Sequence, residues 1–213
     1  AIDARNSNFS YNEIWSQKKV TGKESDSGVG IVLYGRKENS TRTYNVALYG
    51  NNVYNNETEG IRIDVGSASG ATNFVSPSAI NITNNTIYSN GSTIGGVDKY
   101  VGIKSADWSK GVTVSGNTIY GHMGSTISPT SGNAGIWIAA SNGWEIRYNT
   151  IRDNLNGIFF AYSTFDPGSG SHAITYNNIY DNVRGISIDE GNEAVANYQN
   201  IIYDNNVTTF TGE

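Results

Sequence analysis

Two basic residues occupy equivalent places in a repeated phrase of the sequence. Arg62 and Lys104 each stand two residues after the glycine of a Gly-Ile pair, at Gly60 and Gly102. If these phrases stack as neighbouring strands, the two cations lie about 5 Å apart, and their repulsion lowers the pKa of the lysine. A neutral amine beside a bound carboxylate could abstract a proton. The residue types therefore favour Lys104 as a catalytic base and Arg62 as its carboxylate-binding partner.

Two aspartates near this pair leave the chemistry open among three classes. Asp64 and Asp107 offer the oxygen ligands that Ca²⁺ prefers, and a bound Ca²⁺ could assist elimination from an acidic polysaccharide. Two carboxylates at a suitable separation could instead hydrolyse a glycosidic bond, and the neighbours Asp189 and Glu190 form a second such pair. Plain surface salt bridges between each aspartate and the nearest basic residue would explain the same positions without chemistry.

Aromatic residues hold the same place in later copies of the Gly-Ile phrase. Trp137 and Phe159 each follow such a pair, and the period-two alternation of a strand points them outward. Exposed rings on adjacent strands could stack on the apolar faces of sugar rings, with Tyr34 in a neighbouring outward column as a third substrate-binding candidate. Alternatively, the loops at 121–133 or 163–171 fold over Trp137 and Phe159 and bury them.

These positions depend on two short phrases that alternate along the whole chain. The first reads apolar, two variable positions, Asn, one variable position, and Ile or Val, usually followed by an aromatic residue. Its seven copies carry the marked residues Asn12, Asn51, Asn85, Asn117, Asn149, Asn177 and Asn205. The Gly-Ile phrase starts at Gly30, Gly60, Gly102, Gly135, Gly157 and Gly185. Both patterns are typical of short strands with one buried face.

A short strand of this kind needs equivalent neighbours above and below to complete its hydrogen bonds and its core. Stacked coils supply both, and they align the repeated Asn side chains so that these bond to one another. The sequence therefore predicts an all-β protein, a single-domain parallel β-helix over residues 1–213 with about seven rungs and Asn ladders. A second Asn column stands three residues after each Ile or Val, and His122 takes its place on one rung.

The pattern resembles the right-handed parallel β-helix repeat of the pectate-lyase-like superfamily over nearly the whole chain. Members of this superfamily include polysaccharide lyases, glycoside hydrolases, uronate epimerases, phage tailspikes and non-catalytic surface proteins. The resemblance implies the right hand of the coil and an extracellular or cell-surface setting. The signatures of the β-helix polygalacturonases are missing, and Asp166-Pro167-Gly168 lacks the His of the Asp-Pro-His core of alginate epimerases. No specific enzyme family is matched.

Composition narrows the class of partner. The chain carries 14 Lys and Arg against 19 Asp and Glu, a net charge of −5, which argues against nucleic acid because that partner needs a basic patch. No window approaches 18 apolar residues, so we expect no membrane span. The absence of Cys excludes a disulfide scaffold.

The leading interpretation is an extracellular or cell-surface β-helix that binds a polysaccharide and could cleave a uronate-containing polymer as a lyase, with Ca²⁺ as the candidate cofactor. The alternatives are a non-catalytic carbohydrate-binding or structural surface module and, third, a glycoside hydrolase. Ile2 begins inside a rung and the sequence ends six residues after Val207. A missing N- or C-terminal part of the same β-helix is therefore a further expected partner.

Overall fold

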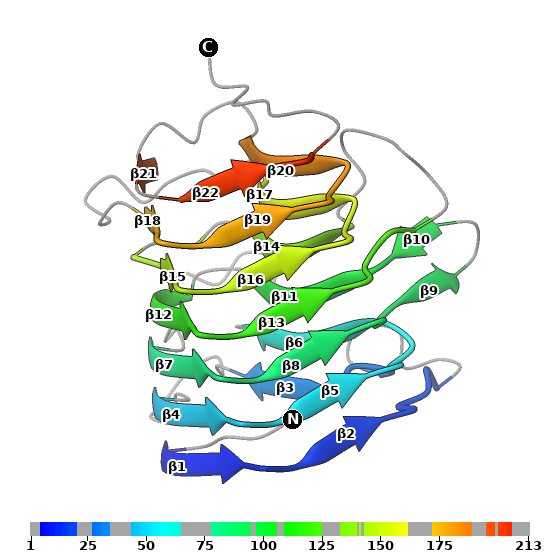
Figure 1. The fold of residues 1–213 in the computed structure, drawn as a ribbon. Helices are drawn as coiled ribbons and strands as arrows, with labels where there is room; N and C mark the ends of the chain where they lie inside the picture. The colour runs from blue at the N-terminus through cyan, green and yellow to red at the C-terminus, as the bar shows by residue number, and fades with distance from the viewer. Residues whose placement is uncertain are drawn as a thin grey trace, which may run out of the picture.

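The chain winds into stacked coils, whose strands form three parallel sheets (Figure 1). The computed structural model describes residues 5–20, 27–34, 44–64, 78–94, 97–105, 109–124, 133–139, 141, 143–161, 172–188, 195–198 and 200–205. The stack runs from the N-terminal coil, blue in Figure 1, to the C-terminal coil, orange and red. The predicted all-β parallel β-helix is confirmed.

We number the three sheets in the order in which each coil passes through them. The first sheet contains seven parallel strands: β1 (Arg5–Ser10), β4 (Tyr44–Tyr49), β7 (Ser78–Thr83), β12 (Lys110–Ser115), β15 (Glu145–Arg147), β18 (His172–Thr175) and β21 (Val195–Tyr198). The second sheet contains seven strands of three residues: β2 (Glu13–Trp15), β5 (Asn52–Tyr54), β8 (Thr86–Tyr88), β13 (Thr118–Tyr120), β16 (Thr150–Arg152), β19 (Asn178–Tyr180) and β22 (Ile201–Tyr203).

The third sheet is built from the Gly-Ile phrases. Its six strands are β3 (Ile31–Tyr34), β6 (Glu59–Asp64), β11 (Val101–Ser105), β14 (Ala134–Ile138), β17 (Asn156–Phe160) and β20 (Arg184–Ile188). Between the second and third sheets of one coil, β9 (Ser92–Ile94) and β10 (Val97–Lys99) pair as an antiparallel hairpin.

Side chains from all three sheets fill one narrow core. Alternation places a column of Ile, Val and Leu inward from each sheet, and these residues are almost completely buried. Ser105 is a polar residue at an inward position of the third sheet. Its hydroxyl hydrogen-bonds to Ser109 and Ser141, and the indole nitrogen of Trp144 donates to Ser109 at 3.0 Å. The hydroxyl of Ser105 is therefore satisfied inside the core.

Two tight turns flank the second sheet in every coil, and each places a side chain in a column along the stack. The first column consists of Asn12, Asn51, Asn85, Asn117, Asn149, Asn177 and Asn200. The second column consists of Gln17, Asn56, Asn90, His122, Asn154, Asn182 and Asn205. Asn205 thus belongs to the second column, and its assignment to the first column from the sequence is wrong.

Hydrogen bonds in the first column join each coil to the next. The main-chain and side-chain nitrogens of Asn117 both donate to Oδ1 of Asn149, at 2.9 and 3.0 Å. Nδ2 of Asn149 in turn donates to the carbonyl of Val114 and to Oδ1 of Asn177. In the second column, His122 accepts from Asn90 at 3.4 Å and bonds Asn154 at 2.9 Å. Asn therefore provides the hydrogen bonds that the main-chain groups of these turns need in nearly every coil.

The corner before the third sheet requires glycine. A Cβ added to Gly102 would lie 2.6 Å from the carbonyl oxygen of Gly135 on the next coil. The same close approach recurs at Gly30, Gly60, Gly135 and Gly157. Glycine therefore marks the Gly-Ile phrase because no side chain fits between neighbouring coils here.

Candidate functional site

The third sheet brings the predicted site residues into one outward column. Strand pairing places Arg62 beside Lys104, Lys104 beside Trp137, and Trp137 beside Phe159. Val32 and Ser187 continue the column at its two ends. The register predicted from the Gly-Ile phrases is confirmed. It places Lys104 between Arg62 of β6 and Trp137 of β14.

A buried carboxylate that the sequence analysis did not single out contacts both cations. Glu59 is 1% exposed and lies in β6, three residues before Arg62. Its carboxylate accepts hydrogen bonds from Arg62 at 2.6 Å and from Lys104 at 3.2 Å. Glu59 therefore links two adjacent coils through a charge cluster of two cations and one anion.

The two cations set the ionisation of Glu59. Burial alone would raise the pKa of this carboxyl, but the positive charges of Lys104 and Arg62 and their hydrogen bonds hold the pKa below its ordinary value. The carboxylate also offsets the repulsion between the two cations. That repulsion was the reason for expecting a neutral Lys104, and the role of Lys104 as a catalytic base stays a prediction.

Trp137 is held against this cluster. The ammonium of Lys104 lies 4.0 Å from the centroid of the indole ring, a cation–π contact. Nε1 of Trp137 is buried and has no hydrogen-bond partner among the described residues, although the residue as a whole is partly exposed. An indole N–H without an acceptor is costly when buried.

Phe159 differs from the expectation. It lies in the outward column beside Trp137, but only 5% of its surface is exposed. The predicted exposure of this ring is therefore wrong. Strand alternation fixes the direction in which a side chain leaves the sheet, whereas its exposure depends on what packs over that face.

The remaining predicted residues lie at the ends of these strands or outside the described part. Tyr34 and Asp64 are paired in register at the ends of β3 and β6. Asp107 lies outside the described residues. Where the structure describes the chain, no group of three or more His, Asp and Glu side chains could hold a metal ion.

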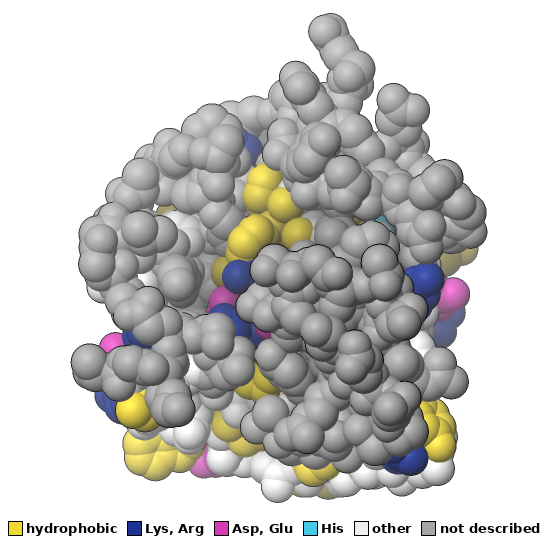
Figure 2. Space-filling view, turned by 180° about the vertical axis from the view of Figure 1, so that it is seen from behind, with side chains coloured by type: hydrophobic (Ala, Val, Ile, Leu, Met, Phe, Trp, Pro, Cys, Tyr) yellow, Lys and Arg dark blue, Asp and Glu magenta, His cyan; other side chains and the backbone are white. Residues whose placement is uncertain are grey.

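The space-filling view from behind shows the face that carries the third sheet (Figure 2). Hydrophobic side chains lie directly next to Lys or Arg and to acidic side chains in a hollow near the middle of this face. The coloured strip has the composition of the outward column, with apolar residues followed by the charge cluster.

Comparison with known proteins places the chain in a family. The family described as the right-handed beta helix region matches residues 68–211, which is more than half of the chain. The chain belongs to the right-handed beta helix family. This membership confirms the resemblance found in the sequence, including the right hand of the coil. A search of curated proteins found no match.

Two solved structures of right-handed beta helix type are similar in fold. The periplasmic alginate epimerase AlgG matches with a TM-score of 0.61 and 16% identity, over 92% of this chain and 39% of the epimerase chain. XylC, solved in complex with xylose, matches with a TM-score of 0.52 and 16% identity, over 69% of this chain and 25% of XylC. The chain thus spans well under half the length of either protein, and these identities establish the fold alone.

The described residues of this beta helix protein contain no helix that is long and apolar enough to cross a membrane.

Proposed function

We propose that the outer face of the third sheet binds a uronate-containing polysaccharide in an extracellular or cell-surface setting. The observation that carries the proposal is the cluster of Glu59, Arg62 and Lys104 beside Trp137. Arg62 and Lys104 bring two positive charges to this face of a chain whose overall charge is −5. A sugar carboxylate is an anion that such groups bind through charge-assisted hydrogen bonds.

The chemistry of the neighbouring groups supports an acidic sugar over a free anion. The carboxylate of the ligand would approach Lys104, whose side chain is more exposed than that of Arg62, at 19% against 10%. The sugar ring would lie along the exposed part of Trp137. Tyr34, which pairs with Asp64, and Phe159, which pairs with Trp137, remain candidate contacts.

The names of the similar structures support a saccharide as the ligand. One is an alginate epimerase, and the other was solved with xylose. At 16% identity these names supply a chemical class to test and no residue roles.

Binding is tested by calorimetry with oligomers of galacturonate and of mannuronate, and with a neutral oligosaccharide as the ligand control. We expect binding of an acidic oligomer that weakens with salt, and a tenfold or greater loss of affinity in Lys104→Ala and in Trp137→Ala. Lys110→Ala removes the same charge from the first sheet and should bind like the wild type. Equal affinity for the neutral oligomer, or equal affinity in Lys104→Ala, would contradict the proposal.

The same samples test the two enzymatic alternatives and the metal. A lyase releases unsaturated uronides, seen as a rise in ultraviolet absorbance, and Lys104→Ala should abolish that rise. A glycoside hydrolase releases reducing ends without it. A role of Asp64 and Asp107 in holding Ca²⁺ predicts that Asp64→Asn and chelation both weaken binding. If Asp64 holds no metal ion and only repels the acidic ligand, Asp64→Asn should instead strengthen binding of that ligand.

A further inference from the structure

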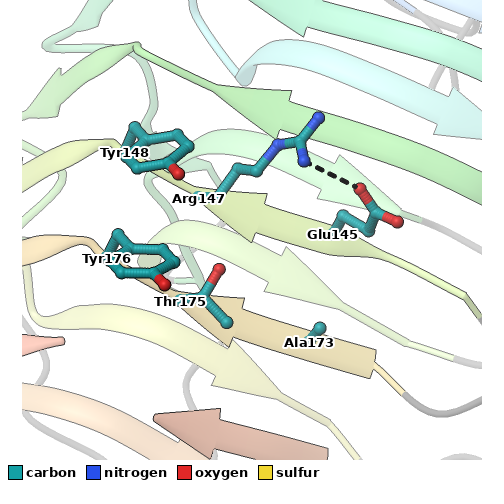
Figure 3. Close-up of a pocket in the computed structure, with 6 residues that line it drawn as sticks. All are labelled: Glu145, Arg147, Tyr148, Ala173, Thr175 and Tyr176. Atoms are coloured by element: carbon teal, nitrogen blue, oxygen red, sulfur yellow. Dashed lines mark ion pairs between the residues drawn. The ribbon is translucent and has the colours of Figure 1, made fainter. Parts of the chain in front are cut away.

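A pocket lies on the outer face of the first sheet, away from the charge cluster. It is a pocket of about 250 Å³ formed between β15 and β18. Six residues line it, namely Glu145, Arg147, Tyr148, Ala173, Thr175 and Tyr176 (Figure 3). This volume is slightly below the range of drug-sized ligand sites, and it therefore suits a ligand of about one sugar ring.

Two tyrosines of the pocket stand in a turn with positive φ. Tyr148 and Tyr176 occupy the position before the first Asn column, with φ of 57° and 56°. Tyr11 and Asn84 adopt the same conformation in other coils, whereas Gly50 and Gly116 adopt it without cost. A bulky residue in this region is unusual and costs about 1 kcal/mol or more.

Burial does not compensate this cost. Tyr148 is 58% exposed and Tyr176 is 47% exposed. Their rings stack on one another, with centroids 5.2 Å apart and planes 13° from parallel. Figure 3 shows both hydroxyl ends on the side of Arg147 and Thr175. The stacked, exposed rings form one wall of the pocket.

The polar groups of the pocket are complementary to a neutral diol. Glu145 and Arg147 project from alternate positions of β15 and lie 3.7 Å apart, so their charges cancel. Both side chains are about half exposed, at 55% and 46%. A carboxylate accepts hydrogen bonds from hydroxyl groups and a guanidinium donates to their oxygens. Vicinal hydroxyl groups of one sugar ring could therefore satisfy both at once.

The floor of the pocket leaves room for such a ring. Ala173 pairs with Glu145 and Thr175 pairs with Arg147 across the two strands. The small Ala173 side chain opposite Glu145 makes the depression, and the Thr175 hydroxyl lies beside the tyrosine wall (Figure 3).

We infer that this pocket is a second carbohydrate site that binds one neutral sugar unit. The tyrosine wall contacts the apolar C–H groups of the ring, and Glu145 and Arg147 bind its adjacent hydroxyl groups. The inference does not depend on the uronate site, because the two sites lie on different sheets and share no residue. It gives the beta helix two faces that engage saccharide chains of different charge.

The test is a titration of the full chain with xylobiose, cellobiose and mannobiose, followed by nuclear magnetic resonance of the backbone amides. We expect at least one of these sugars to shift the amides of residues 145–148 and 173–176 in a saturable way. Tyr148→Gly should weaken that binding tenfold or more. Glycine already occupies the equivalent turn position in two coils, Gly50 and Gly116, so this variant is expected to fold.

Matched variants make the outcome unambiguous. Tyr11→Gly removes an exposed tyrosine from the same turn position of the first coil, where φ is 56°, and should leave binding unchanged. Glu145→Gln should weaken binding and Ala173→Gln should block it by filling the floor. The inference is overturned if no disaccharide shifts these amides, if Tyr148→Gly binds as the wild type does, or if acidic oligomers bind this pocket better than neutral ones. Loss of uronate binding in Lys104→Ala would leave this result unaffected.

Discussion

Lys104 donates a hydrogen bond to Glu59 at 3.2 Å, although 45 residues separate the two along the chain. The contact exists because the coils place β6 and β11 side by side, and Arg62 completes it from the same strand as Glu59. A buried charge of this kind is tolerated only while its partners remain in place.

Glu59→Gln should therefore destabilise the fold by about 3 to 5 kcal/mol, because it leaves two adjacent cations without their buried counter-charge. Glu145→Gln is the matched control, since Glu145 pairs with Arg147 at an exposed position where such pairs contribute about 0 to 1 kcal/mol. Chemical denaturation of the two variants measures both. Similar losses in the two would show that the cluster is not held as described.

Asn149→Ala should cost about 1 to 3 kcal/mol, because it leaves the main-chain nitrogen of Asn117 and the carbonyl of Val114 without partners inside the turn. Asn81→Ala changes the same residue type at an exposed outward position of β7 and should be nearly neutral. The free energies of unfolding of the two variants decide the point. Equal free energies of unfolding in Asn149→Ala and Asn81→Ala would show that the first Asn column does not stabilise the fold.

Gly102→Ala should cost about 2 to 3 kcal/mol, because its Cβ would lie 2.6 Å from the carbonyl of Gly135 and force the coils apart. Gly111→Ala is a useful comparison. Nothing lies within 4 Å of a Cβ added at Gly111, and Ala79 already adopts the same positive φ one coil earlier. We expect Gly111→Ala to lose only about 1 kcal/mol of stability, from the backbone conformation. Thermal melts of both variants provide the measurement, and a larger loss in Gly111→Ala than in Gly102→Ala would show that the close approach is unimportant.

Stability should fall as the pH is lowered from about 6.5 to about 4. Burial lowers the pKa of His122 to about 4, and burial likewise lowers that of His172 to about 4. Over this window the unfolded chain binds protons that the folded chain does not, so each histidine removes about 1.4 kcal/mol of stability per pH unit. Above about pH 6.5 their full contribution is present.

His122→Asn tests this origin, because Asn is the residue that the second column uses in the neighbouring coils, at Asn90 and Asn154. The variant should fold and should lose about half of the decline between pH 6.5 and 4. Denaturation midpoints measured across this range provide the readout. An unchanged slope would rule out His122 as a source of the decline. Glu59, whose pKa is lowered, acts only in the more acidic window below its ordinary value.

The sequence was sufficient for the architecture because the repeat carries its own register. Apolar residues at fixed offsets from Asn and Gly predicted which side chains share a column, and the strand pairing of Lys104 with Arg62 and Trp137 agrees. The last copy of the Asn phrase failed for a local reason. Asn197 stands where the preceding coil has the apolar Ile174, so Asn200 lost the apolar residue that marks its phrase.

The site was less accessible to sequence reasoning. Glu59 directly precedes Gly60, at the corner where the alternation starts, and its two partners lie three residues away and one coil away. No periodic pattern reports such a contact. The pocket on the first sheet was missed for a similar reason, since Tyr148 and Tyr176 stand in variable positions of the Asn phrase and their spacing from Glu145 gains meaning only after stacking.

The spacing between the two columns is the same in every coil: five residues separate Asn12 from Gln17, and five separate Asn200 from Asn205. The distance from one coil to the next, in contrast, falls from 39 residues at the start of the stack to 23 at its end. All growth and loss of sequence has therefore been confined to the stretch that runs through the third and first sheets. The edge that carries the two columns keeps a constant spacing in every coil. The opposite side accommodates segments of different length within the same stack. Both proposed saccharide sites lie on that variable side, so grafting segments between coils offers a route to altering what the protein binds while keeping its frame.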